Sequence, residues 1–402
     1  MKLSEYGRKF LNLPLRIDKH NKGYVDFYIG PKKIRKIVDN EAITSPSKLL
    51  TDCKTLQKDL SKQGYDKKRE RYLEKILMSM RTSIEILNRV EIPFKEQFLR
   101  LYDVALQPVK ESELDNLKEE FNAAYGGPGS LEKRMNDLRV RRSIPKGKVF
   151  ELFKKALNIT RELTKELFVD LLPENEQVIL ELVENNINNE AKWSYYNWYL
   201  GNFRSRIEVN LNYNMYWSAF LSAAAHEGYP GHHTEFVVKE QRLYRELNQF
   251  EHSILLLNSP KLIISEGIAN TAVNVLLSYR NQAEISLREF CPDFSKEDSL
   301  DALMAQNKVK VKTHLFLYNL AYYALIDGWS EERLIRYATS FEIFSQENIK
   351  NQLKLIFNPI YSTTVFSYNI GTNLIMNKYG DLLKVKDFQN LLVNAIFPSD
   401  LV

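Results

Sequence analysis

Three of the six histidines in this 402-residue chain lie within eight residues of one another. They are His226, His232 and His233, in the stretch AAAHEGYPGHHTEF at residues 223–236, and Glu227 directly follows the first of them. Imidazole nitrogens are common metal ligands, and a carboxylate beside a bound metal is suited to act as a general base. This density of ligand-type side chains predicts a metal site.

The spacing differs from the two-histidine helix motif, in which both ligands lie four residues apart on one face. Pro230 stands four residues after His226, while His232 and His233 follow at six and seven residues. In a straight helix the sixth residue points to the far side, and the seventh lies roughly 10 Å along the axis. Neither could share an ion with His226 there, because Zn–N bonds are only about 2.0–2.1 Å long.

The residues at 228–231, Gly-Tyr-Pro-Gly, are suited to interrupt the helix. If the helix bulges out two residues and resumes at His232, the relation between His226 and His232 becomes similar to a four-residue spacing. We therefore predict these two as ligands, with His233 pointing elsewhere or supporting the site. A site that uses His233 instead is an alternative, and so is a simple proline-glycine turn with three incidental histidines.

A catalytic zinc site needs a third protein ligand besides two imidazoles and a water. The later stretch NSPKLIISEGIANTAVNVLLSY is typical of a buried helix that begins at Asn258 or Ser259. Its one acidic residue, Glu266, requires a partner in such apolar surroundings. We predict Glu266 as the third ligand and Asn270, one turn further, as the residue that orients it. Alternatively, Glu266 simply reaches solvent.

The elements that must position these residues are expected to be helices. Glycine and proline are sparse, with 15 and 13 residues, and 44% of the chain is hydrophobic, which favours a mainly α protein with a substantial core. The stretch SPSKLLTDCKTLQKDLSKQG shows the pattern: apolar residues recur at helical spacing, Ser45 or Ser47 is the expected cap, and Gly64 the expected end.

One stretch departs from the helical pattern. SRIEVNLNYN alternates apolar and polar residues, which predicts a strand over residues 205–212. Because it precedes the histidines by about 15 residues, we expect it to line the site as an edge strand that aligns an extended substrate. The alternative is a small sheet that only packs against a loop.

Charge and cysteine content limit the partners. The chain has 56 Lys and Arg against 51 Asp and Glu, a net charge of +5, so it requires neither nucleic acid nor an anionic membrane. Two isolated cysteines, Cys53 and Cys291, make no disulfide framework and indicate a reducing compartment. Neither a secretory signal core nor an 18-residue apolar span is present in the sequence. We expect a cytoplasmic protein with no nucleic-acid and no membrane partner.

The motifs resemble those of a known family. HEGYPGHH followed by SEGIANTA resembles the His-Glu-x-x-Pro-Gly-His-His and Glu-Gly-(aromatic)-Ala patterns of the uncharacterised-domain family 885, whose members are predicted gluzincin-type zinc metallopeptidases. The resemblance covers mainly residues 195–375. It implies a large helical metallopeptidase-like fold with a small β-sheet beside the active-site helix. It also implies one Zn²⁺ per chain on His226, His232 and Glu266, with Glu227 as the catalytic base.

A third stretch, NPIYSTTVFSYNIGTNLI at 358–375, is similar to the family's Pro…Ser-Tyr-x-x-Gly segment. This match implies that Tyr368 projects into the cleft and stabilises the oxyanion formed during hydrolysis. The chain departs from the family pattern in two places. Ile268 replaces the usual aromatic residue, and residues 317–338 contain neither a histidine nor a clear Arg-Asp pair where the family often has an Arg/Asp/His cluster.

Taken together, the sequence predicts a zinc-dependent hydrolase, a metallopeptidase that acts on a peptide or small amide substrate. Manganese and cobalt also suit two histidines and a carboxylate. One alternative is a metal-dependent hydrolase of non-peptide amides or esters, and another is a helical binding protein that has lost catalysis. Residues 1–195 are expected to form an N-terminal helical region and residues 196–402 the catalytic region, joined in one continuous structural unit.

Overall fold

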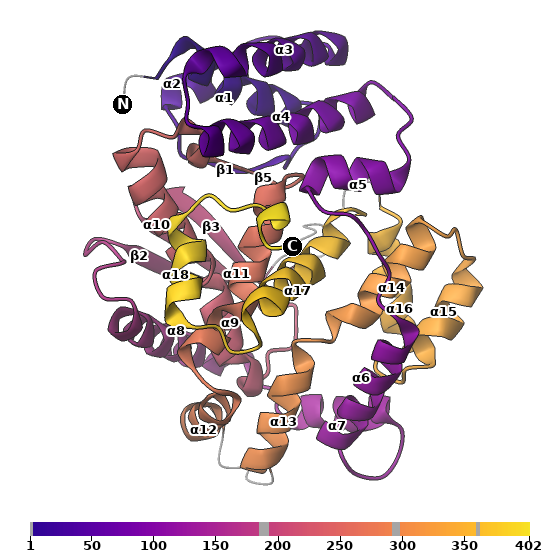
Figure 1. Ribbon diagram of the computed structural model, residues 1–402. Helices are drawn as coiled ribbons and strands as arrows, with labels where there is room; N and C mark the ends of the chain where they lie inside the picture. Colours follow the sequence, from indigo (N-terminus) through magenta and orange to yellow (C-terminus); the bar gives the residue numbers. More distant parts are fainter. Residues whose placement is uncertain (1–2, 185–192, 292–297, 359–361) are drawn as a thin grey trace.

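The computed structural model describes residues 3–184, 193–291, 298–358 and 362–402. The chain is 64% helical and 8% strand, so the predicted mainly α fold with a small sheet is confirmed. Figure 1 shows the N-terminal helices stacked at one end of the molecule, and the sheet and the remaining helices gathered below them. The helices that carry the histidine segment, α9 (Phe220–Glu227) and α10 (His232–Lys239), lie in the lower, larger part, and the C-terminus lies near the middle of the view.

The N-terminal end is built from short amphipathic helices. Its elements are α1 (Glu5–Asp18), β1 (Val25–Tyr28), α2 (Lys32–Asn40), α3 (Pro46–Asp59), the 3-10 turn η1 (Leu60–Gln63) and α4 (Lys67–Leu87). The start of α3 follows the sequence prediction, because the Ser45 hydroxyl accepts a hydrogen bond from the backbone N–H of Lys48. The chain leaves the following 3-10 turn at Gly64, whose left-handed conformation suits glycine.

The core of this end is shared with distant parts of the chain. Leu49, Cys53 and Leu56 of α3 are buried in one hydrophobic cluster with Phe250 and Phe397. The Phe397 ring stacks on Tyr72 of α4, with 4.5 Å between ring centroids. The N-terminal helices therefore pack on residues from the middle and the end of the sequence.

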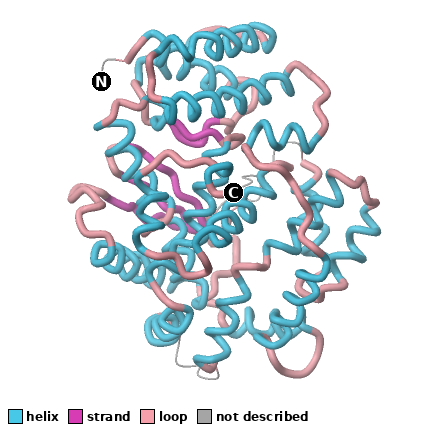
Figure 2. Tube along the Cα trace, viewed as in Figure 1, coloured by secondary structure: helices cyan, strands magenta, loops and turns pink. Residues whose placement is uncertain are grey.

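The small sheet has three strands in the order β2-β4-β3. They are β2 (Gln177–Val183), β3 (Tyr195–Gly201) and β4 (Arg204–Asn210); β2 runs parallel to β4, and β3 runs antiparallel to it. The strands are magenta in Figure 2. The strand predicted at 205–212 therefore exists as β4, but the expectation that it is an edge strand was wrong. Both of its backbone edges are paired, so it has none left for a substrate. Alternation predicts a strand but not its place in the sheet.

The central elements follow the sheet in sequence. They are the 3-10 turn η2 (Trp217–Ala219), α9 (Phe220–Glu227), α10 (His232–Lys239), the π-helix η3 (Glu240–Glu246), the 3-10 turn η4 (Phe250–Ser253), β5 (Ile254–Leu256), α11 (Pro260–Leu276) and α12 (Tyr279–Glu289). β5 pairs antiparallel with β1. α11 begins after Ser259, one of the two predicted caps, and its residues are buried on nearly every side.

Helices on either side of this centre complete the molecule. They are α5 (Phe94–Tyr102), α6 (Glu111–Ala124), α7 (Leu131–Arg141), α8 (Lys146–Leu167), α13 (Leu300–Lys310), α14 (His314–Leu325), α15 (Glu331–Thr339), α16 (Gln346–Ile356), the 3-10 turn η6 (Thr364–Phe366), α17 (Ser367–Tyr379), α18 (Val385–Val393) and the 3-10 turn η7 (Pro398–Asp400). Among the described residues, no single helix is long and apolar enough to cross a bilayer; the bent pair α11–α12, with 81° between its helices, passes that test only as a pair.

Two glycines fix how α17 crosses α11. A Cβ atom on Gly371 would lie 2.0 Å from the carbonyl oxygen of Ile263, and a Cβ on Gly267 would lie 2.6 Å from the backbone of Gly371. No side chain fits between backbones at this distance, so both positions require glycine. The glycine after Glu266 and the glycine three residues after Tyr368 thus bring the two C-terminal motifs together.

Candidate metal centre

The break in the histidine segment has the form that the sequence predicts. α9 ends at Glu227 and α10 begins at His232, with the Gly-Tyr-Pro-Gly stretch between them. The N–H of Gly231 bonds to the carbonyl of Ala225 at 2.9 Å. A Cβ on Gly231 would lie 2.1 Å from the carbonyl oxygen of His226, so only glycine permits this close return of the chain. α10 therefore starts directly beside the end of α9.

The break brings three predicted ligands together. His226 at the end of α9, His232 at the start of α10 and Glu266 in α11 each offer a ligand atom, and these atoms lie within 4.8 Å of one another. The carboxylate oxygens of Glu266 lie 3.9 Å from Nε2 of His226 and 3.8 Å from Nε2 of His232. Two donors on one tetrahedral ion lie roughly 3.4 Å apart, so small side-chain adjustments suffice for a shared ion.

The chemical state of these side chains fits a cation. Burial lowers the pKa of His232 to about 4, and burial, followed by the proximity of His232, lowers the pKa of His226 well below its usual range. Both imidazoles are therefore neutral, the form that binds metals. Burial and then the Glu227 carboxylate raise the pKa of Glu266, and its Oε2 atom is buried with no hydrogen-bond partner among the described residues. A cation at this point would satisfy that oxygen.

A chain of hydrogen bonds sets the orientation of His232. The Ser265 hydroxyl donates to Glu235 at 2.6 Å, and Glu235 also accepts from Lys239 at 2.6 Å. Since Ser265 gives its only proton to Glu235, its oxygen accepts from Nδ1 of His232 at 3.2 Å. The proton of His232 is then on Nδ1, which leaves the lone pair of Nε2 facing Glu266.

The ring of His226 is held from the neighbouring helix. Asn270, one turn beyond Glu266 in α11, hydrogen-bonds to the His226 side chain. From the sequence we predict that Asn270 orients Glu266, and in the structure Asn270 contacts His226. The reason is that α9 packs along α11, so the turn after Glu266 faces the end of α9.

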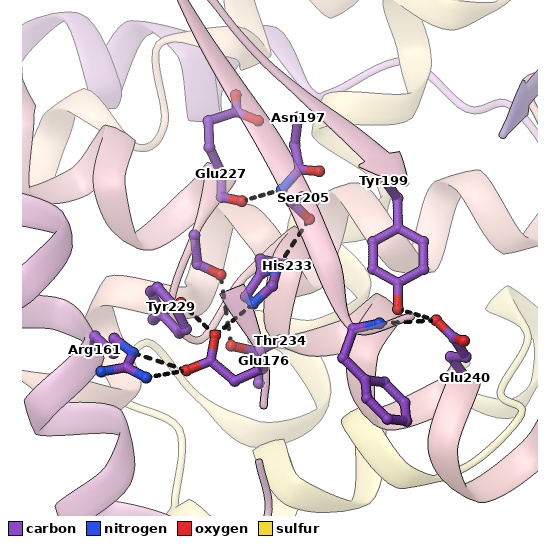
Figure 3. Close-up of polar contacts among 12 residues, drawn as sticks. Arg161, Glu176, Asn197, Tyr199, Ser205, Glu227, Tyr229, His233, Thr234 and Glu240 are labelled. Carbon is purple, nitrogen blue, oxygen red and sulfur yellow. Dashed lines mark hydrogen bonds and ion pairs between the residues drawn. The ribbon is translucent and has the colours of Figure 1, made fainter. Parts of the chain in front are cut away.

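His233 lies outside the cluster. Figure 3 shows its ring between Ser205 and Glu176: Nδ1 is 2.8 Å from the Ser205 hydroxyl, and Nε2 is 2.9 Å from Glu176. Glu176 also accepts hydrogen bonds from Tyr229 and Arg161. Both ring nitrogens are therefore used in linking α10 to the sheet, and His233 does not take the place of His232.

Glu227 lies next to the three residues. Its Oε1 atom is 3.9 Å from Nε2 of His226. Burial, together with the nearby Asp26 carboxylate, raises its pKa to about 8. Its backbone carbonyl accepts a hydrogen bond from the Asn197 side chain (Figure 3), which ties the end of α9 to β3. The backbone of Tyr368 belongs to the first turn of α17, but its side chain lies outside the described part of the structure.

The cluster opens into a hollow of about 340 Å³, here called the metal hollow. His226, Glu227, His232 and Glu266 line it together with one half of β3, residues 195–198. Among the described strands, β3 pairs with β4 alone, so its other backbone edge borders this hollow. Sequence reasoning missed β3 as the edge strand; the aromatic run YYNWYL, typical of a strand, was the signal that could have found it. It also missed Ser265, a hydroxyl within the apolar turn before Glu266.

Comparisons with known proteins identify a fold but no family. No protein-family model matches the chain, and no curated protein matches it. Among solved structures it is similar to "the putative lipoprotein from Colwellia psychrerythraea", with TM-score 0.53 and 11% identity over 92% of this chain and 68% of that chain. It is also similar to "a putative lipoprotein of unknown function from Shewanella oneidensis", with TM-score 0.52 and 13% identity over 92% and 74% of the two chains. At these identities the likeness shows the fold alone.

Proposed function

We propose that this protein is a zinc-dependent hydrolase and that its substrates are peptides. The observation that carries the proposal is the convergence of His226, His232 and Glu266 within 4.8 Å at the wall of a hollow, with Glu227 beside them. A structural zinc site is closed by four protein ligands. Three protein ligands with an acid next to them, open to a hollow, fit a catalytic site better.

Each residue of the site has its own role in the proposed hydrolysis. Zn²⁺ bound there would supply a Lewis acid and lower the pKa of water. Glu227 takes a proton from the attacking water and passes it to the leaving amine. Tyr368, by its resemblance to the family segment, donates a hydrogen bond to the developing oxyanion.

The sheet favours a peptide over other amides. Ser194 pairs with Asn210 through a backbone hydrogen bond of 2.9 Å. Because antiparallel strands alternate their bonding direction, the N–H and C=O groups of Tyr195 and Asn197 point away from β4. These groups border the metal hollow, where an extended peptide can pair with them.

Replacement of the proposed base tests the catalytic role. Glu227→Gln keeps the size of the side chain and removes its basicity, so we expect hydrolysis to fall by about 10²–10⁴-fold while the metal content stays at the wild-type level. A peptide library analysed by mass spectrometry, with a parallel panel of esters and non-peptide amides, measures the activity. Glu246→Gln, at an exposed site beyond α10, is the control.

Turnover at a near wild-type rate in Glu227→Gln would contradict the assignment of Glu227 as the base. Cleavage of the esters or small amides with no cleavage of peptides would favour the second candidate, a non-peptide hydrolase. Absence of turnover on either panel by the metal-loaded wild type would favour the third candidate, a binding protein.

For the location, we propose the cytoplasm, as the sequence predicts. Both structural neighbours are described as a "putative lipoprotein", which favours the alternative, a place in the cell envelope. Cell fractionation separates the two: recovery in the cytosolic fraction supports the first, and recovery with membranes supports the second.

A further inference from the structure

We propose that the cleft beside the metal centre binds a carboxylate of the substrate through Lys310, on the side of the scissile bond that leaves as the amine. The inference rests on the proposed function and deepens it: the preferred substrates are peptides with a free carboxylate close behind the cleaved bond. Such an enzyme removes short pieces from the C-terminal end of a peptide.

Three hollows adjoin one another across the metal centre. The metal hollow meets a second hollow of about 360 Å³ at Trp193, Tyr195, His226 and Glu227. The second hollow continues into a third, also of about 360 Å³, and Lys310 lines both of them. A chain lying through the three hollows would pass His226 and Glu227 with one end in the metal hollow and the other near Lys310.

The charges on the two sides of the metal centre are opposite. The described lining of the metal hollow includes Asp26 and Glu266 but no lysine or arginine. The second and third hollows are lined by Lys310, Arg139 and Arg142, and among their described lining residues Glu227 is the only acid. Since charges in a cleft act over several ångströms, this arrangement attracts an anionic group to the second and third hollows.

Lys310 is the cation best placed to receive that group. Arg142 already forms a two-fold ion pair with Asp298, at 2.7 and 3.1 Å, and packs over Trp217. Lys310 is exposed at the end of α13, and its ammonium group forms neither a salt bridge nor a hydrogen bond with the described residues. It also lines the second hollow together with His226 and Glu227, whereas Arg139 and Arg142 line only the third. In Figure 1, α13 lies at the lower end of the molecule, below α9.

The direction of β3 agrees with the charges. β3 runs from Tyr195, which borders all three hollows, to Asn197 and Trp198, which border only the metal hollow. Antiparallel pairing is the more stable arrangement for an added strand. A substrate antiparallel to β3 places its N-terminal part in the metal hollow and its C-terminal part toward Lys310. Strand direction and charge therefore predict the same orientation.

The reaction needs no co-reactant besides water. The C–N bond breaks, the water oxygen forms a bond to the carbonyl carbon, and the leaving nitrogen receives one proton. The anionic C-terminal piece departs with its carboxylate unchanged. The carboxylate that binds near Lys310 is either the α-carboxylate of the peptide or the side chain of an Asp or Glu in the same place.

Binding measurements without turnover test this inference separately from catalysis. In the Glu227→Gln protein, loaded with zinc, the dissociation constants of acetylated hexapeptides are measured by isothermal titration calorimetry. The peptides share one neutral sequence and end in a free acid, in an amide, or in an amidated glutamate. We expect the free acid to bind about tenfold more tightly than the amide, as one charged hydrogen bond would provide. If the peptide with the amidated glutamate binds as tightly as the free acid, or more tightly, the side-chain carboxylate is the group that the cleft recognises.

Variants of α13 connect the preference to one side chain. Lys310→Met should reduce the ratio of acid to amide affinity to near one, and Lys310→Arg should keep it. Lys308→Met removes the same charge from an exposed position of the same helix that lines none of the three hollows, so the ratio should stay unchanged. Equal affinities for all peptides, no binding of any peptide, or a preference that survives Lys310→Met would overturn the inference. A preference for the acid in a protein with no hydrolytic activity would support the carboxylate site and overturn the hydrolase.

Discussion

The hydroxyl group of Ser265 most directly determines which ring nitrogen of His232 faces the other ligands. It accepts from Nδ1 of His232 while donating to Glu235. Replacement by alanine removes that acceptor, and the imidazole is then free to take the other tautomer. We expect Ser265→Ala to weaken metal binding by about 10–100-fold, measured by competition with a chelator of known affinity.

Ser286→Ala is a matched control for this change, because Ser286 is also a buried serine, on α12. It should leave the affinity for the metal unchanged. The same affinity in Ser265→Ala as in the wild type would show that the Ser265 hydroxyl does not determine the tautomer of His232.

Glu176 makes a different contribution, to stability. Burial by itself would raise its pKa, but hydrogen bonds from His233, Tyr229 and Arg161 outweigh that effect and lower the pKa from 4.5 to about 2. A carboxyl with a lowered folded-state pKa stabilises the protein fully above pH 4.5, and this stabilisation is lost as the pH falls toward 2. This lowering of the Glu176 pKa corresponds to roughly 3 kcal/mol in the free energy of unfolding.

We therefore expect Glu176→Gln to lower the free energy of unfolding by roughly 3 kcal/mol at pH 7 and to cause a much smaller loss near pH 3. Urea unfolding at both pH values measures this. Glu162→Gln removes an exposed carboxylate that also lies near Arg161, at 3.6 Å, and should cost little at either pH. An equal loss at both pH values in Glu176→Gln would show that ionisation of this group does not stabilise the fold.

At the scale of elements, the crossing of α11 and α17 is set by Gly267 and Gly371. A methyl group at position 371 would contact the Ile263 carbonyl at 2.0 Å, so the two helices must separate. We expect Gly371→Ala to lower the free energy of unfolding by about 1–3 kcal/mol or more. Gly147, in the first turn of α8, has open space around it, and Gly147→Ala should be neutral or stabilising. Thermal unfolding compares the two, and equal stability of both variants would contradict the close crossing.

Some features of these elements could be predicted from the sequence, and others could not. The break after Glu227 was predictable, because a proline and two glycines leave few ways to continue a helix. The position of Glu266 followed from the cost of a lone acid in an apolar helix. The place of β4 in the sheet was not predictable, because it depends on pairing with β2 and β3 across other parts of the chain.

At the scale of the whole molecule, composition indicated a mainly α protein, but not how its parts join. The N-terminal helices share a hydrophobic cluster with Phe250 and Phe397, which lie hundreds of residues away in the sequence. Local patterns contain no information about such long-range contacts. The contrast in charge across the three hollows also arises from residues on separate elements, among them Asp26 and Lys310. These residues are far apart in the sequence, and the fold places them around neighbouring hollows.

The metal content of the purified protein tests the central claim most directly. Protein prepared without chelators or nickel affinity resin is analysed by plasma mass spectrometry, with circular dichroism to confirm folding. Wild type is compared with His226→Ala, His232→Ala and His233→Ala. We predict about one zinc ion per chain in the wild type and in His233→Ala, and loss of the ion in the other two variants. No metal above background in the wild type after zinc is added back, or full metal content in His226→Ala, would contradict the account.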